Sequence, residues 1–221
     1  DYTLSSAISG SGSVIKTGSG ALTLTGDNSA FAGNMMLTGG ATVIDGSTTS
    51  GNIVFLGGLD GASLTVVNGG TFNAPNIIVS NSTNSAMPGM EDESGSLLVT
   101  GTGSTVTTEF LTVGYYGDGS VAIENGGTVV VNTSTSVGAV EGSVGSITVS
   151  GENSHLQSGS LQFGGSGQGT LILSGGATLQ STSGSFGVNA GSLGTGTLSG
   201  VGTRWDIGAS GLGIGTSGEG I

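Results

Sequence analysis

A short motif recurs along the chain at intervals of about 25 residues, and this period constrains the fold more than any other feature. The motif is a Gly, a small residue and a few alternating apolar residues. Its copies follow one another at nearly even spacings: Gly95-Ser-Leu-Leu-Val99, Gly119-Ser-Val-Ala-Ile123, Gly145-Ser-Ile-Thr-Val149, Gly169-Thr-Leu-Ile-Leu173 and Gly196-Thr-Leu198. A unit of this length cannot bury its own apolar side chains, so we expect the units to stack on one another.

Each unit holds three short strands separated by Gly-rich turns. This organisation predicts an all-β fold, a right-handed single-stranded parallel β-helix that forms a solenoid with three strands per rung of about 25 residues. Propeller blades are longer than this period, and sandwiches need no repeat. Alternate strand residues should face the interior and stack there: Leu97, Val99, Val121, Ile123, Ile147, Val149, Leu171 and Leu173. The unit at residues 196–202 is two residues short, so we expect its first strand to be clipped or irregular.

Composition excludes several classes of function. The 221 residues include 48 Gly, fourteen acidic side chains, two basic ones (Lys16 and Arg204) and no Cys, for a net charge of −12. The chain therefore has no disulfide, no Cys-ligated zinc and no thiol nucleophile. Two cations cannot neutralise a run of phosphates, which excludes nucleic-acid binding, and they argue equally against an anionic membrane surface. We expect no cofactor and no metal.

Residues 10–43 carry a second pattern, with matches at Gly10, Gly12, Lys16, Gly18, Gly20, Leu22, Leu24, Gly26, Asn28 and Gly33. This pattern resembles the passenger-associated transport repeat of bacterial autotransporters, the proteins of type V secretion. Val14 stands where that repeat usually has Leu, and Phe31 where it usually has Tyr. The later units are similar to the β-strand repeats of large autotransporter passengers.

The resemblance implies a Gram-negative passenger that is secreted or displayed at the bacterial cell surface by way of the outer membrane. It also implies a C-terminal outer-membrane β-barrel in the full-length chain, which these residues do not include. We therefore expect a passenger, or a fragment of one, that forms a single β-helix domain over residues 1–221. Within it, residues 10–43 are the transport repeat, residues 80–94 a protruding loop and residues 95–221 regular rungs.

An enzyme would need a catalytic constellation, and the sequence supplies none that is convincing. His155 is the lone imidazole, at a strand position that we match with Val106 and Trp205, and no Gly-Asp-Ser-Gly nucleophile motif occurs. The acidic cluster Glu91-Asp92-Glu93 lacks the spaced oxygens of a calcium loop. The interpretation is therefore that the chain is not an enzyme.

Candidate partner-binding residues lie in three places. They are the adjacent pair Tyr115 and Tyr116, the pair Arg204 and Trp205, and the loop residues Met87, Met90, Glu91, Asp92 and Glu93. Tyr and Trp are frequent contact anchors, and Met adapts to irregular apolar surfaces. For the tyrosines, packing across rungs is the competing interpretation.

The predicted function is a non-enzymatic virulence or adhesion factor that binds host or neighbouring cells. Its partner would be a host cell-surface protein or glycan, or a like passenger through self-association. Three alternatives stay open: a released soluble effector that engages a host receptor as a growth-factor mimic, a β-helix enzyme that acts on polysaccharide, and a structural display stalk.

Overall fold

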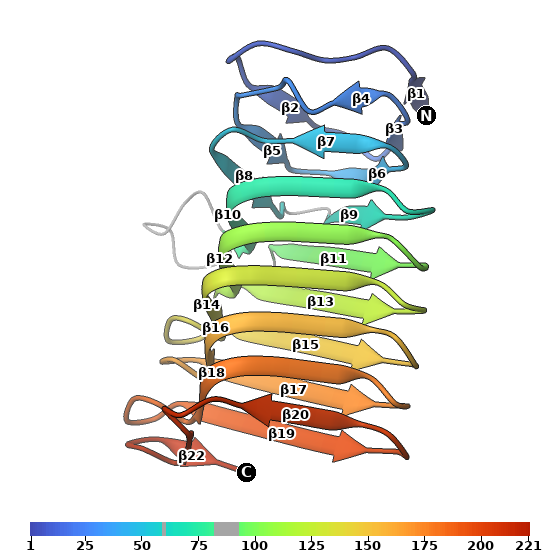
Figure 1. Ribbon diagram of the computed structural model, residues 1–221. Helices are drawn as coiled ribbons and strands as arrows, with labels where there is room; N and C mark the ends of the chain where they lie inside the picture. The colour runs from blue at the N-terminus through green and yellow to red at the C-terminus, as the bar shows by residue number, and fades with distance from the viewer. Residues whose placement is uncertain (59–60, 82–92) are drawn as a thin grey trace.

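Strands that are neighbours in space are one turn apart in the sequence. Leu97 pairs with Val121, Val121 with Ile147, and Ile147 with Leu171, and all three pairings are parallel. The computed structural model describes residues 1–58, 61–81 and 93–221. In Figure 1 the front strands run to the left and the rear strands to the right as the chain descends, which makes the coil right-handed. The prediction of a parallel β-solenoid is confirmed, and the coil has about nine turns.

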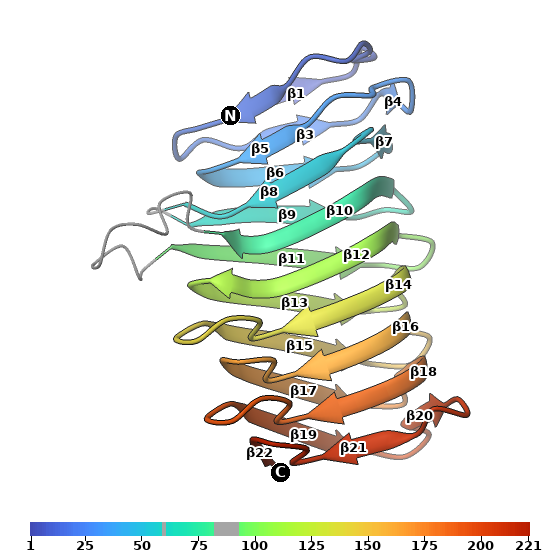
Figure 2. The ribbon, with the colours of Figure 1, turned by 90° about the vertical axis from the view of Figure 1, so that its left-hand side faces the viewer.

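Two parallel sheets form the long walls of the coil (Figures 1 and 2). The ten-stranded sheet contains β1 (Tyr2–Leu4), β3 (Leu22–Leu24), β6 (Gly40–Ile44), β9 (Ala62–Val66), β11 (Ser94–Thr100), β13 (Asp118–Glu124), β15 (Val144–Ser150), β17 (Gln168–Ser174), β19 (Leu193–Ser199) and β22 (Glu219–Gly220). The twelve-stranded sheet contains β2 (Val14–Lys16), β4 (Asp27–Asn28), β5 (Met35–Leu37), β7 (Ser47–Thr49), β8 (Ile53–Leu56), β10 (Thr71–Asn81), β12 (Thr105–Tyr116), β14 (Thr128–Val137), β16 (His155–Phe163), β18 (Thr178–Phe186), β20 (Arg204–Ile207) and β21 (Leu212–Ile214). None of the described residues is helical.

The second and third strands of each predicted unit are joined in most turns. They are separate as β7 and β8, and both pair with the single long strand β10 of the next turn. In β10, β12, β14, β16 and β18 one long strand covers both positions. The register of the pairing between β12 and β14 shifts between Thr108 and Phe110, where the strand bends. They separate again as β20 and β21. The described turns thus have two main sheets, and the third face of the coil is the second limb of the bent strand.

The interior of the coil is apolar and closed to solvent. All eight residues predicted to face it are at most 2% exposed. Aromatic rings fill the end near the C-terminus, where Phe163 and Phe186 stack with their centroids 5.0 Å apart. The sequence repeat thus predicts the interior positions correctly, because in each strand only every second side chain points toward the opposite sheet.

The prediction of a clipped or irregular strand at Gly196 is wrong. Gly169 pairs with Gly194, not with Gly196, so the repeat keeps its ordinary spacing here and β19 extends over the full Leu193–Ser199. Gly196 instead pairs with Leu171 and takes a place in the interior row that Leu holds one turn earlier. The prediction failed because the Gly-Thr-Leu string used for the alignment begins at Gly196, two residues after Gly194, the residue that pairs with Gly169.

One corner of the coil uses glycine in five of its turns, with φ between +61° and +70°. Gly138, Gly164, Gly187 and Gly215 directly follow β14, β16, β18 and β21, and Gly114 lies two residues before the end of β12. Glycine adopts this left-handed conformation without the strain a side chain would add. The predicted protruding loop follows a similar corner, where β10 ends at Asn81 and β11 begins at Ser94; residues 82–92 of that loop lie outside the described residues.

Candidate functional site

Two tyrosines end β12 and contact each other at a corner of the coil. The ring centroids of Tyr115 and Tyr116 lie 4.5 Å apart in an edge-to-face arrangement, and both residues are half-buried. A side-chain hydrogen bond with Tyr115 raises the pKa of Tyr116, so this phenol stays neutral at physiological pH. Ser80 Oγ donates to the carbonyl of Tyr116 at 3.0 Å and to the carbonyl of Glu93 at 2.9 Å. The structure therefore brings the tyrosine pair next to Glu93.

Most of the predicted loop candidates cannot be placed relative to the tyrosines. Met87, Met90, Glu91 and Asp92 fall outside the described residues. Glu93 is described, and it is buried with 6% of its surface exposed.

Arg204 and Trp205 are neighbours in the sequence but point to opposite sides of β20. Arg204 faces outward, where its Nη2 atom lies 2.7 Å from Asp206 Oδ2. Trp205 packs against the interior, donates from Nε1 to Ser181 Oγ at 2.9 Å, and meets Phe186 edge to face at 6.0 Å between centroids. The two side chains therefore do not form one contact surface.

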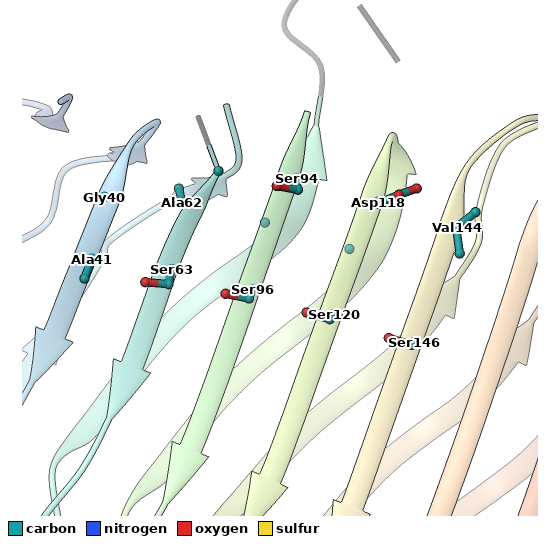
Figure 3. Close-up of a pocket in the computed structure, with 13 residues that line it drawn as sticks. Gly40, Ala41, Ala62, Ser63, Ser94, Ser96, Asp118, Ser120, Val144 and Ser146 are labelled. Atoms are coloured by element: carbon teal, nitrogen blue, oxygen red, sulfur yellow. The ribbon is translucent and has the colours of Figure 1, made fainter. Parts of the chain in front are cut away.

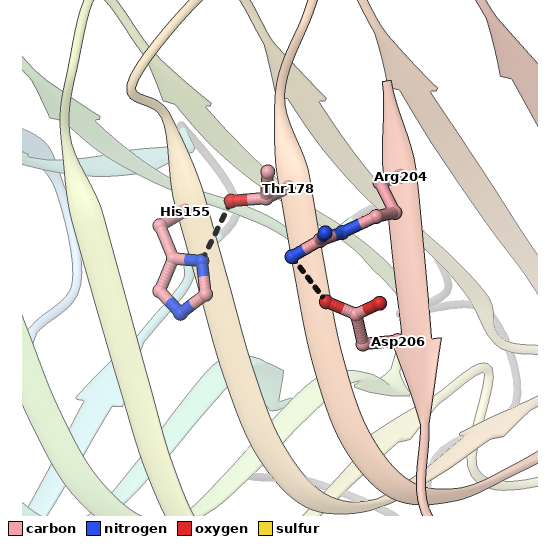
Figure 4. A network of polar contacts seen from close by, with 4 residues as sticks. All are labelled: His155, Thr178, Arg204 and Asp206. Carbon is pink, nitrogen blue, oxygen red and sulfur yellow. Dashed lines mark hydrogen bonds and ion pairs between the residues drawn. The ribbon is translucent and has the colours of Figure 1, made fainter. Parts of the chain in front are cut away.

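His155 lies on the same outward row as Arg204 (Figure 4). The predicted match of His155 with Val106 and Trp205 is wrong by one residue, because Leu156 occupies that inward row. His155 Nδ1 and Thr178 Oγ1 lie 2.8 Å apart. Burial lowers the pKa of His155, so the imidazole is neutral at pH 7.

A groove of about 360 Å³ lies beside this row, at the corner where β16, β18 and β20 end their first limb. One wall consists of Gln157, Gln180 and Asp206, which pair in register on three consecutive turns. Asn132 and Thr182 also line the groove. We call this hollow the corner groove.

A second, shallower groove of about 600 Å³ lies on the outer face of the ten-stranded sheet (Figure 3). Its floor is a ladder of hydroxyls from Ser63, Ser96, Ser120 and Ser146, which follow one another in register. Asp118 stands at its edge. Small side chains make the depression, and the bulkier Thr170 continues the ladder beyond it.

An apolar row lies on the outside of the coil, on the first four turns. Ile15, Met36, Phe55 and Ile78 pair in register and alternate with buried residues, so they face solvent. Ile15 is 62% exposed, and Met36, Phe55 and Ile78 are half-buried. The same row continues as polar residues, beginning with Thr112. We call these four residues the outer apolar row.

The residues of the 10–43 pattern hold structural positions in the first turns. Lys16 Nζ donates to the carbonyls of Gly39 at 2.7 Å and Gly18 at 2.8 Å. Asn28 is buried; its Oδ1 accepts from the Ile8 amide at 2.7 Å and its Nδ2 donates to Thr48 Oγ1 at 3.2 Å. These side chains tie one turn to the next.

Within the described ranges, no three His, Cys, Asp or Glu side chains gather closely enough to hold a metal ion. A search of the same residues for a helix that could span a membrane finds none.

No protein-family model, no curated protein and no solved structure matches the chain. What the fold defines is a class, the all-β parallel β-solenoids with two main sheets and one circuit of the coil per sequence repeat.

The two grooves and the outer apolar row were not predicted from the sequence. Each is a row of side chains from different turns, so it exists only once the register between turns is known. The signal was present in the repeat: aligning the Gly-Ser copies places Ser96, Ser120 and Ser146 at one position.

Proposed function

We propose that this chain is the passenger, or part of the passenger, of a type V secretion system, and that it binds a protein on the surface of a host or neighbouring cell. It acts by contact and without catalysis. The proposal makes it an extracellular adhesion factor of a Gram-negative bacterium.

The observation that supports the passenger class is the structural role of the 10–43 pattern. A transport repeat that is a folding unit should have its characteristic residues in contact, and Lys16 and Asn28 both bridge consecutive turns. Gly33 fits the same account, because a Cβ at this position would collide with the carbonyl oxygen of Gly12. Each of these positions thus has a physical reason for its residue type.

The outer apolar row supports the adhesion part of the proposal. Apolar side chains on the outer surface, exposed at Ile15 and half-buried at Met36, Phe55 and Ile78, form a contiguous row of the kind found at protein contact sites. Two copies of the chain, each with a net charge of −12, repel one another, which favours a different protein over a second copy. We therefore assign this row to a heterologous protein partner, with self-association as an alternative outcome of the test.

Binding of the labelled, purified chain to epithelial cells and to Gram-negative bacteria, measured by flow cytometry, tests adhesion. We expect saturable binding that falls severalfold in the double variant Ile15→Thr, Phe55→Thr, because the row then loses much of its apolar surface. Gln162→Thr, on the polar half of the same row, is the matched control and should bind like the unchanged chain.

Other outcomes separate the alternatives. Receptor phosphorylation on adding soluble chain would favour an effector, and polysaccharide cleavage that a single carboxylate substitution abolishes would favour an enzyme. Absence of saturable binding to both cell types would leave the display stalk. Fusion of the chain to an outer-membrane translocator tests the secretion class, since surface display should follow and should be lost when Lys16 and Asn28 are both replaced by Ala.

A further inference from the structure

Three consecutive turns near the C-terminus carry long polar side chains where the two turns before them carry Thr and Val. Gln157, Gln180 and Asp206 occupy one outward row that continues from Val130. Two residues earlier on these strands, His155 and Arg204 lie on the adjacent outward row, with Thr178 between them (Figure 4). The long polar side chains thus lie on these three turns beside the corner groove, whereas the same two rows carry the shorter Thr105, Thr107, Thr128 and Val130 on the two turns before.

The amide groups of this row are available to a ligand. No hydrogen bond among the residues that the structure describes engages the side chain of Gln157 or Gln180, although both line the groove. Asn132, which also lines the groove, is oriented because its Nδ2 donates to Glu109 Oε1 at 2.7 Å. The groove therefore presents hydrogen-bond donors and acceptors from Gln157, Gln180 and Asn132.

The charges at the groove argue against an anionic ligand. The guanidinium of Arg204 is paired with the carboxylate of Asp206 at 2.7 Å. His155 is held by Thr178 and lies beside the groove as a neutral ring. Among the described residues around the groove, an anion would meet no unpaired cation, and the chain as a whole carries a net charge of −12.

Spacing argues against an extended peptide, and the side-chain amides suit the hydroxyls of a sugar. The backbone groups of β16 and β18 already pair with each other, so a ligand meets side chains only. These side chains repeat about every 4.8 Å along the coil, whereas an extended peptide advances about 3.3 Å per residue and falls out of step. A pyranose ring carries hydroxyls on both edges, and each can donate to and accept from an amide.

We infer that the corner groove formed by β16, β18 and β20 binds a neutral oligosaccharide. Gln157 and Gln180 hydrogen-bond the sugar hydroxyls, and Asp206 accepts from a further hydroxyl. This site is separate from the outer apolar row, and it does not depend on the proposed adhesion to cells.

The test uses the purified chain with cellotetraose, maltotetraose and chitotetraose, each titrated in the millimolar range. His155 is the one imidazole of the sequence, so its NMR signals report on the groove without ambiguity. We expect at least one neutral tetrasaccharide to shift the signals of His155 and the two glutamine amides in a saturable way. Tetragalacturonate, which is anionic, should bind more weakly.

Variants assign the contacts. The double variant Gln157→Ala, Gln180→Ala should weaken binding about tenfold or more, which is the effect of two lost hydrogen bonds. Gln162→Ala, an exposed glutamine on the other limb of β16, should leave binding unchanged. Asp206→Asn, which keeps an acceptor oxygen, should bind better than Asp206→Leu.

Three results would overturn the inference. They are no saturable shift with any of the three neutral sugars, equal affinity in the double variant, or tighter binding of tetragalacturonate. Because the assay contains only sugar and the purified chain, its result does not depend on whether the chain binds cells.

Discussion

Phe186 occupies the space that the absent side chain of Gly196 leaves in the interior. A Cβ on Gly196 would lie 2.8 Å from Cζ of Phe186, closer than packed carbon atoms approach. Phe186 also stacks on Phe163 one turn earlier and contacts Trp205 one turn later. A small residue in one sheet is thus matched by a large residue in the other.

This match predicts a dependence between the two positions. Gly196→Ala should lower the free energy of unfolding by about 1–3 kcal/mol, because the added carbon overpacks the interior. In a Phe186→Leu background the same substitution should cost less, since the ring that it meets is gone. A double-mutant cycle in urea measures the difference, and additive effects of the two substitutions would contradict the packing account.

Thr42 offers a substitution that should stabilise the protein. It is fully buried in an interior row between Leu22 and Leu64, and its hydroxyl has no hydrogen-bond partner among the described residues. Thr42→Val keeps the shape and removes the unpaired hydroxyl, so the free energy of unfolding should rise by about 1 kcal/mol. Thr23→Val, at a neighbouring position on the outer face, is the control and should change stability little. A loss of stability in Thr42→Val would show that the hydroxyl has a partner.

Asn28 should be required for order in the first turns. Asn28→Ala leaves the amide of Ile8 and the hydroxyl of Thr48 without their partner, which should cost about 2 kcal/mol. Since solenoid turns depend mainly on their neighbours, the loss should be local. Hydrogen exchange should show faster exchange at Ile8 and unchanged protection in β16 and β18. Ser29→Ala, at the next and exposed residue, should leave both regions unchanged.

His155 gives a pH dependence of known sign. Burial holds its pKa below 6.5, the value for an exposed imidazole, so the unfolded chain binds this proton at a higher pH than the folded chain. As the pH falls from 6.5 through the folded pKa, this residue lowers the free energy of unfolding; at higher pH both states are neutral. Comparing the pH dependence of unfolding with that of His155→Gln isolates the effect from the acidic residues. An NMR titration of His155 that gives a pKa above 6.5 would contradict the prediction.

The fold could be predicted because a strict period leaves few ways to bury the apolar residues. Leu97 and its counterparts identify the interior row without any structure. The mistakes at Gly196 and His155 have one cause: similar short strings occur one or two residues out of register, and a shift of one residue exchanges inside for outside. The grooves depend on the same register across three or more turns. They could not be read from any single unit, and Arg204 and Trp205 show that adjacency in sequence does not place side chains on one surface.

The spacing between paired strands has a consequence for how such a chain can change. β11 and β15 each pair with β13 through the same seven positions, and Gly95, Gly119 and Gly145 mark the same place in all three strands. Residues 118–143 form one whole circuit between equivalent points, so excising them would bring β11 against β15 with matching ends. Deletion or duplication of one circuit would therefore shorten or lengthen the coil by one turn, while the remaining turns keep their structure.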